Sequence, residues 1–240
     1  MKIYCELTDS TEYNQFCCLE NGVYTIRISR NFKYWYYDLC DLIDFYKGSE
    51  VVLDLDIERS EINSARALYG NHKFNEKHLR EYETKALVHS TPLENLDSIR
   101  KDNALKSWNA CKAEKADWEI EPIGALLGDI ADFSNYVMLS TPLQNNEIIT
   151  ASKQKRVIDT NPNQEYQPGA RFYLDGDKLA ADGLLLRDGL HIKVRDRIPF
   201  DKYLIWYATA ENSGLSKTST PKDFFERSNE IFFELYPQYK

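Results

Sequence analysis

Apolar and polar residues alternate along two early segments of the chain. Residues 24–29 (YTIRIS) have the period of two that is typical of a half-buried strand, and residues 51–58 (VVLDLDIE) keep this period more strictly. Between them, residues 34–46 repeat apolar side chains at helical spacing, which predicts that their aromatic rings pack in a core. Residues 58–84 are strongly polar, and a helix is predicted over residues 75–82.

The C-terminal third of the chain has a different pattern, with short apolar runs separated by turn residues. Four strands are predicted in close succession, over ARFYL, GLLLR, LHIKV and YLIWYATA. The Asp-Gly pairs at Asp182-Gly183 and Asp188-Gly189 are typical of hairpin turns between such strands. A final amphipathic helix is predicted after Ser219-Thr220-Pro221.

The tetrapeptide Ser-Thr-Pro-Leu occurs twice, starting at Ser90 and at Ser140, and each copy follows a short apolar run. In both copies an acidic or amide side chain stands three residues after the threonine, with Glu94 after Thr91 and Gln144 after Thr141. This spacing, with proline between, predicts a capping box at a helix N-terminus. Such an end either stabilises a helix alone or also binds an anion. His89, at the end of the first apolar run, favours a functional site.

Composition narrows the class of protein. The chain has 240 residues, 42% of them hydrophobic, which is enough for one large domain or two small ones. A formal net charge of -8 argues against a broad nonspecific surface for nucleic acid. The five cysteines are scattered and include no CxxC pair, so neither a zinc site nor a disulfide framework is indicated. No apolar run approaches the roughly 20 residues of a membrane span, and we expect a cytoplasmic protein without a membrane partner.

Three segments in order resemble ADP-ribosyltransferase-like folds. ALVHSTPLENLDSIRKDNALKS is similar to their opening strand and helix, where the strand ends in His-x-Thr. SNYVMLSTP is similar to the second motif of DarT-type DNA ADP-ribosyltransferases and KptA-type RNA 2′-phosphotransferases, and residues 170–204 resemble the C-terminal run of the KptA type. The resemblance covers residues 85–210. It implies an α+β fold with a split β-sheet core and flanking helices over residues 85–240, which follows an N-terminal α/β module over residues 1–84.

The resemblance implies that NAD is the substrate, and it assigns His89 to the nicotinamide ribose. The expected contacts to NAD come from His89, Ser90, Thr91, Tyr136, Ser140 and Lys153. Ser90 stands where the family usually has glycine, and Met138 stands where the KptA type has its second histidine. Recognition of a 2′-phosphate by that histidine is therefore lost.

His191 stands on the strand where DarT-type and poly-ADP-ribosyl-type enzymes have their catalytic glutamate. Imidazole can act as a general base near neutral pH. It cannot reproduce the stabilisation that a carboxylate gives to a developing oxocarbenium cation. Catalytic roles are expected for His89 and His191, and the chemistry is either altered or absent.

Three functions follow from these patterns. The first is an NAD-dependent ADP-ribosyltransferase that modifies a nucleic acid or a protein, in the manner of a toxin or defence enzyme. The second is a non-catalytic NAD-binding or nucleotide-binding regulatory module with a degenerate transferase fold. The third is a glycosyltransferase that uses Asp54 and Asp56, because a DxD pair on one face of a strand can hold a divalent cation, although a solvated strand face gives the same pattern.

Overall fold

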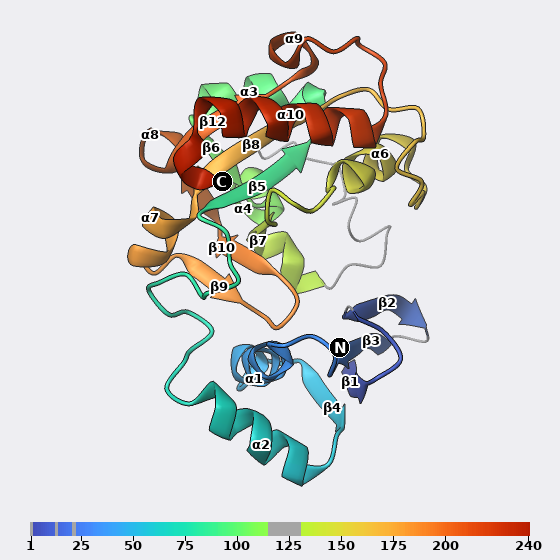
Figure 1. The fold of residues 1–240 in the computed structure, drawn as a ribbon, viewed down its shortest axis with the longest axis vertical. Coiled ribbons are helices and arrows are strands. Elements are labelled where there is room, and N and C mark those ends of the chain that lie inside the picture. Colours follow the sequence, from blue (N-terminus) through green and yellow to red (C-terminus); the bar gives the residue numbers. More distant parts are fainter. Residues whose placement is uncertain (1, 13, 21–22, 115–130) are drawn as a thin grey trace.

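The structure, a computed structural model, describes residues 2–12, 14–20, 23–114 and 131–240. It combines helices with several small sheets, which is consistent with the expected α+β class. Figure 1 shows an N-terminal part (residues 2–69) below and a C-terminal part (residues 86–240) above, joined by a connecting segment (residues 70–85). The boundary expected after residue 84 lies at the upper end of this segment.

The N-terminal part is a four-stranded sheet in the order β2-β3-β1-β4. Its strands are β1 (Lys2–Thr8), β2 (Gln15–Glu20), β3 (Val23–Ser29) and β4 (Val52–Asp56). Strand β1 is parallel to β3 and β4, whereas β2 is antiparallel to β3. The predicted helix is α1 (Trp35–Tyr46), whose buried Leu39 and Leu42 share a core with Ile3 and Ile26 of the sheet. The alternation and the helical spacing in the sequence are thus confirmed.

The helix predicted over residues 75–82 is wrong. Helix α2 (Arg59–Tyr69) lies earlier and buries Ala65 and Tyr69, whereas residues 75–82 form turns and bends. The guanidinium of Arg80 in this stretch is buried against the Asp41 carboxylate of α1. This long-range ion pair holds the connecting segment against α1, so its polar residues do not wind into a helix.

Two three-stranded antiparallel sheets form the C-terminal part. One has the order β12-β8-β5 and the other the order β7-β10-β9. The strands are β5 (Ala86–Thr91), β7 (Tyr136–Leu139), β8 (Ala170–Asp175), β9 (Leu185–Arg187), β10 (Ile192–Arg195) and β12 (Leu204–Ala208). All four strands predicted for the C-terminal third are therefore confirmed.

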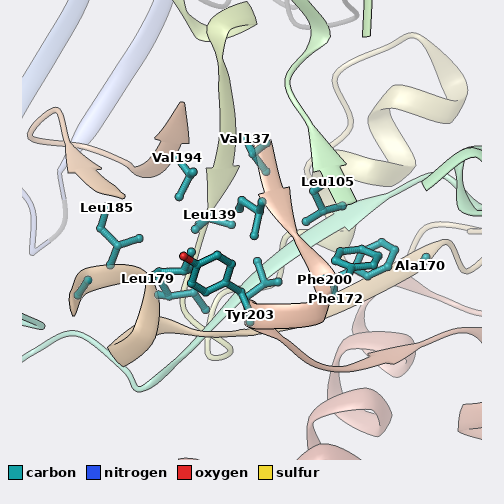
Figure 2. Packing of buried hydrophobic residues seen from close by; sticks show 14 residues of the cluster. Leu105, Val137, Leu139, Ala170, Phe172, Leu179, Leu185, Val194, Phe200 and Tyr203 are labelled. Carbon is teal, nitrogen blue, oxygen red and sulfur yellow. The ribbon is translucent and has the colours of Figure 1, made fainter. Parts of the chain in front are cut away.

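The two sheets meet at a bridge between Val88 of β5 and Ser140, which directly follows β7. The N–H of Val88 donates to the Ser140 carbonyl at 2.8 Å, and the N–H of Ser140 donates to the Val88 carbonyl at 3.0 Å. Between the sheets lies an apolar cluster in which Phe172 and Phe200 pack together, with ring centroids 5.3 Å apart (Figure 2). Each sheet contributes one face to this cluster.

The remaining elements surround these sheets. A two-stranded sheet pairs β6 (Ala104–Lys106) with β11 (Arg197–Pro199). The helices are α3 (Leu96–Asp102), α4 (Trp108–Glu114), α6 (Glu147–Lys155), α7 (Gly176–Ala181), α8 (Phe200–Tyr203), α9 (Ala210–Ser213) and α10 (Pro221–Leu235), with short 3-10 turns at Leu93–Asn95, Ala131–Asn135 and Pro237–Tyr239. In the described part of the chain, no helix is long and apolar enough to cross a membrane.

The capping boxes predicted at the two Ser-Thr-Pro-Leu copies are wrong. Thr91 is the last residue of β5 and pairs with Ala170, and its hydroxyl accepts a hydrogen bond from the side chain of Asn95 at 2.9 Å. After Thr141 the chain forms a turn, and α6 begins only at Glu147. Sheet pairing therefore overrides the capping signal at Thr91. At Thr141 the side chain of Gln144 accepts the backbone N–H of Thr141 at 3.3 Å, but the contact closes a turn and not a helix. The third Ser-Thr-Pro does cap a helix, since the Thr220 hydroxyl accepts the N–H of Asp223 at 3.0 Å in the first turn of α10.

The two Asp-Gly pairs have different outcomes. Asp188-Gly189 begins the turn between the antiparallel strands β9 and β10, as predicted. Asp182-Gly183 instead follows helix α7, which the sequence pattern did not predict. Gly189 has a φ of +88°, and a Cβ there would lie 2.3 Å from the backbone oxygen of Asp38. Glycine is required at this position because the turn is pressed against α1.

Candidate functional site

A cavity of about 340 Å³ lies between α1 and the connecting segment on one side and the β7-β10-β9 sheet on the other. The N-terminal part contributes Asn14 and Asp38, and the C-terminal part contributes Ser140 and His191. The volume is at the lower end of the range of small-molecule sites, which is roughly 300–1,000 Å³. Two of the residues predicted from the sequence, Ser140 and His191, are thus brought together on its wall.

His191 is placed by the tight turn before β10. Its backbone N–H donates to Oδ1 of Asp188 at 2.8 Å, and its ring Nδ1 lies 3.4 Å from the same oxygen. The Phe133 ring meets the imidazole edge to face, with centroids 5.0 Å apart. The backbone hydrogen bond to a buried carboxylate and the packing against Phe133 therefore place the imidazole at the cavity wall.

Asp188 itself is 2% exposed and also accepts a hydrogen bond from Nζ of Lys193 at 2.6 Å. Burial alone would raise the pKa of this carboxyl, but the proximity of His191 and Lys193 holds it well below its usual range. Asp188 is therefore ionised at neutral pH. The negative charge of Asp188 therefore lies next to the His191 ring.

Carboxyl groups outnumber guanidinium groups on the cavity wall. The acidic residues are Glu12, Asp38, Asp41 and Glu83, and the arginines are Arg80 and Arg187. Nη2 of Arg80 donates to Asp41 at 2.9 Å and Nη2 of Arg187 donates to Glu83 at 2.6 Å, so both arginines are already paired. The carboxyl groups of Glu12 and Asp38 are thus in excess over the two arginine pairs.

Asp38 is the carboxyl group in the cavity with the most perturbed proton affinity. Its Oδ2 accepts a hydrogen bond from Nδ2 of Asn14 at 2.8 Å. Burial, together with the neighbouring Asp41 and Asp188, raises the pKa of Asp38 to about 8, although the hydrogen bond from Asn14 and the charge of Arg80 lower it. Perturbed carboxyl groups in a cleft are concentrated at functional sites.

Tyr136 and Met138 of β7 face the N-terminal part. The Tyr136 ring lies 6.0 Å from the ring of Phe45, and Nζ of Lys193 lies 4.5 Å from the Tyr136 centroid. Met138 packs against the core of the N-terminal sheet. The structure therefore places Tyr136, a predicted NAD contact, in the packed interface between the two parts.

His89 directly follows Val88 of the Val88–Ser140 bridge and does not line the cavity. Its Nδ1 is 2.9 Å from the backbone oxygen of Met138. Burial lowers the pKa of His89 to about 4, and the nearby charge of Lys153 acts in the same direction. The imidazole is neutral at physiological pH, with Nδ1 as the donor, and the predicted pair of His89 and Lys153 is brought together.

Ser90 points to the opposite face of β5 from His89. Its hydroxyl donates to Oε1 of Glu147 at 2.5 Å, and the same carboxylate is bound by Arg171 and Tyr166. Glu147 is fully buried at the start of α6, so a carboxylate of the protein itself occupies that helix N-terminus. Ser90 thus helps to hold β5 against α6. The hydroxyl of Thr91 accepts the hydrogen bond from Asn95 described above.

The acidic side of the cavity is not among the sites predicted from the sequence. Asp38 and Asp41 stand three residues apart in a helix whose other residues, apart from Cys40 and Asp44, are aromatic or aliphatic, and Asp41 is 1% exposed. Acidic residues on the buried face of a helix are rare unless they are paired. This was the signal that could have identified them.

The DxD pair is accounted for by the strand face. Asp54 forms an ion pair with Lys2 at 2.7 Å, and Asp56 accepts the hydroxyl of Tyr4 at 2.7 Å. Among the residues with described side chains, these aspartates join no cluster of metal-binding groups. The contacts are those of a solvated strand face.

Comparison of the chain with protein-family models, with curated proteins and with solved structures finds no significant match. The ADP-ribosyltransferase-like fold and the use of NAD therefore stay predictions from the sequence motifs. The cavity and its side chains are the structural basis for assigning a function.

Proposed function

We propose that this chain is an NAD-dependent ADP-ribosyltransferase and that the cavity holds the nicotinamide-ribose end of NAD. The observation that carries this proposal is the imidazole of His191, which lies beside the Asp188 carboxylate at the wall of an acidic cavity. The resemblance of the sequence motifs indicates NAD as the substrate, and the side chains on the cavity wall are the groups proposed to carry the reaction.

The charge of the cavity suits a cationic reacting group. In ADP-ribosyl transfer the bond between the nicotinamide nitrogen and C1′ of the ribose breaks, and its electron pair leaves with nicotinamide. The nicotinamide ring is cationic before this step and the ribose becomes cationic during it. Of the two carboxyl groups in excess over the arginines, Asp38 is largely protonated near neutral pH, and a bound cation would favour release of its proton. Once ionised, Asp38 would stabilise both states together with Glu12 in a site of low dielectric constant. These carboxyl groups come from the N-terminal part, which offers a substitute for the glutamate that β10 lacks.

His191 is the proposed general base. As the acceptor hydroxyl or amine attacks C1′, the neutral imidazole takes its proton, and Asp188 stabilises the imidazolium that forms. Ser140 would contact the ribose from the end of β7. His89, beside the bridge, and Lys153 would contact the remainder of the nucleotide, where the ammonium suits a phosphate.

The test is nicotinamide release from NAD by the purified protein, with binding measured separately by calorimetry. We expect His191→Gln to lower turnover by 10²- to 10⁴-fold, the usual contribution of a general base, with little change in NAD affinity. Glu234→Gln, an exposed change on α10, is the matched control and should turn NAD over like the wild type. His89→Ala should weaken NAD binding.

The outcomes separate the alternatives. NAD that does not bind the wild-type protein would overturn the proposal. Binding without turnover, in the wild type and in His191→Glu alike, would identify a regulatory NAD-binding module instead. For an active protein, labelled NAD added to a cell lysate, followed by nuclease or protease treatment, shows whether the acceptor is nucleic acid or protein.

A further inference from the structure

A second group of side chains with metal-binding chemistry lies in the connecting segment, outside the cavity wall. His72, Glu76 and His78 each direct one ligand atom to a common point, and these three atoms all lie within 4.8 Å of one another. Oε2 of Glu76 is 2.8 Å from Nδ1 of His72 and 3.3 Å from Nε2 of His78. In a tetrahedral zinc site with bonds of about 2.0–2.1 Å, neighbouring ligand atoms are about 3.3 Å apart.

The atoms that do not face this point are held from outside it. Nε2 of His72 lies 2.9 Å from the hydroxyl of Tyr37, and Oε1 of Glu76 is bound by the guanidinium of Arg80. Metal-binding imidazoles and carboxylates usually have such outer partners, which fix the ring orientation and the tautomer. Tyr37 therefore directs Nδ1 of His72 inward, and Arg80 does the same for Oε2 of Glu76.

Exposure differs among the three side chains in a way that suits an ion with an open position. The side chain of Glu76 is 5% exposed, that of His72 is 36% exposed and that of His78 is 66% exposed. The carboxylate is thus anchored inside, while the imidazole of His78 lies toward solvent. A metal ion could enter from the His78 side and keep water as its fourth ligand.

We propose that His72, Glu76 and His78 bind one divalent transition-metal ion of the zinc type. Two imidazoles and one carboxylate are a donor set that such ions prefer, whereas calcium and magnesium prefer oxygen ligands alone. The ion would tie both ends of residues 72–78 together. This loop also provides the Phe74 carbonyl for the N–H of Arg187 and the His78 carbonyl for its guanidinium. The metal would therefore hold a wall of the cavity in place.

The test is titration of the chelator-treated full chain with Co²⁺, followed by visible absorption, and with Zn²⁺, followed by calorimetry and melting temperature. We expect one equivalent to bind, with a rise in melting temperature. His78→Ala should raise the dissociation constant more than tenfold, and because this side chain is largely exposed the variant should fold. Tyr37→Phe keeps the ring and loses the hydroxyl, and it should weaken binding by about 10-fold through His72.

Asn75→Ala, an exposed neutral change in the same loop, is the matched control and should bind metal like the wild type. Absence of saturable binding in the wild type would overturn the proposal. So would a His78→Ala variant that binds with unchanged affinity. All titrations are made without NAD, so their result is independent of the proposed transferase activity.

Discussion

Two buried arginines, one in the C-terminal part and one at the junction of the two parts, show how similar chemistry serves different ends. Arg171 and Glu147 are both 0% exposed, and Arg80 and Asp41 are both 1% exposed. Arg171 is enclosed by Glu147, Tyr173 and the Pro142 carbonyl, and none of these groups reaches the cavity. Arg80 and Asp41 both line the cavity.

Access to the cavity distinguishes a structural ion pair from one that can contact a ligand. A buried ion pair that is closed on all sides fixes neighbouring elements, here β8, α6 and α10, and offers nothing to a ligand. A pair of the same kind beside a cavity positions charges that a ligand can meet. Burial and pairing alone therefore do not identify a functional arginine, and access to a cavity does.

The largest effect should come from Glu147→Gln, which leaves Arg171 buried without a carboxylate among its described partners. We expect a loss of about 3–5 kcal/mol in the free energy of unfolding, measured by urea denaturation. Asp41→Asn should cost less, about 2–3 kcal/mol, because Arg80 keeps its contact with Glu76. Equal losses would show that the two arginines depend on their partners alike.

The affinity for NAD should also differ between Asp41→Asn and Glu147→Gln. Asp41→Asn should weaken NAD binding, because the carboxylate lines the cavity, whereas Glu147→Gln should leave the affinity unchanged where it is folded. Calorimetry at low temperature measures both. A folded Glu147→Gln variant that binds NAD more weakly than the wild type would contradict the conclusion that Glu147 has only a structural role.

Gly189→Ala should destabilise the junction by about 2–4 kcal/mol, since it combines a left-handed backbone with a clash. The new Cβ would lie 2.3 Å from the Asp38 backbone oxygen and 2.9 Å from Cβ of Leu42. Gly214→Ala is the matched control, because Gly214 has a φ of +69° and no atom within 4 Å of the added Cβ. Thermal unfolding should show a clearly smaller loss for the control, about 1 kcal/mol.

The pH dependence of stability should differ in sign between the two regions. Asp38, at the junction, has its pKa raised from 3.8 to about 8, so the folded state holds a proton that the unfolded state has released. Its contribution therefore falls as pH rises from about 4 to 8. His89, in the upper sheet, has its pKa lowered from 6.5 to about 4, so its contribution falls as pH drops through that window.

Single variants separate these opposing contributions. Asp38→Asn should flatten the loss toward pH 8, and His89→Gln should flatten the loss toward pH 4. Each effect should be on the order of 1–2 kcal/mol, because solvent near both side chains weakens it. Urea denaturation at pH 4.5, 6 and 8 measures them, and parallel curves for either variant and the wild type would reject its assignment.

The smallest effect concerns helix caps. Thr220→Ala should cost about 1 kcal/mol, because it removes the hydroxyl that accepts the N–H of Asp223. Thr141→Ala should cost less, since the Thr141 hydroxyl caps no helix. A comparison of melting temperatures tests this directly, and a larger loss at Thr141 would contradict the assignment.

The sequence predicted those features that depend on neighbours along the chain. Period-two alternation identified β3 and β4, helical spacing identified α1, and Asp188-Gly189 identified the hairpin that carries His191. Prediction from these patterns was wrong where contacts between residues far apart in the sequence determine the structure. Thr91 has a capping signal but pairs with Ala170, which is far away in the sequence.

The acidic side of the cavity escaped prediction for the same reason. Asp38 and Asp41 acquire their role only when α1 packs under the β9-β10 turn. The charge of a cavity is a property of two surfaces brought together, and no local pattern contains it. His191 was predicted from the family resemblance, and the structure places it on the cavity wall with Asp188 three residues away.

The Val88–Ser140 bridge makes the C-terminal part mechanically uneven. Within each sheet a ladder of hydrogen bonds shares any load, whereas across the seam the described backbone offers two bonds, at 2.8 and 3.0 Å. The apolar cluster of Figure 2 adds cohesion there, but cohesion of this kind has no preferred direction. A pulling force applied across the two sheets would therefore part them at this seam first, with Val88 and Ser140 as the pivot and each three-stranded sheet still whole.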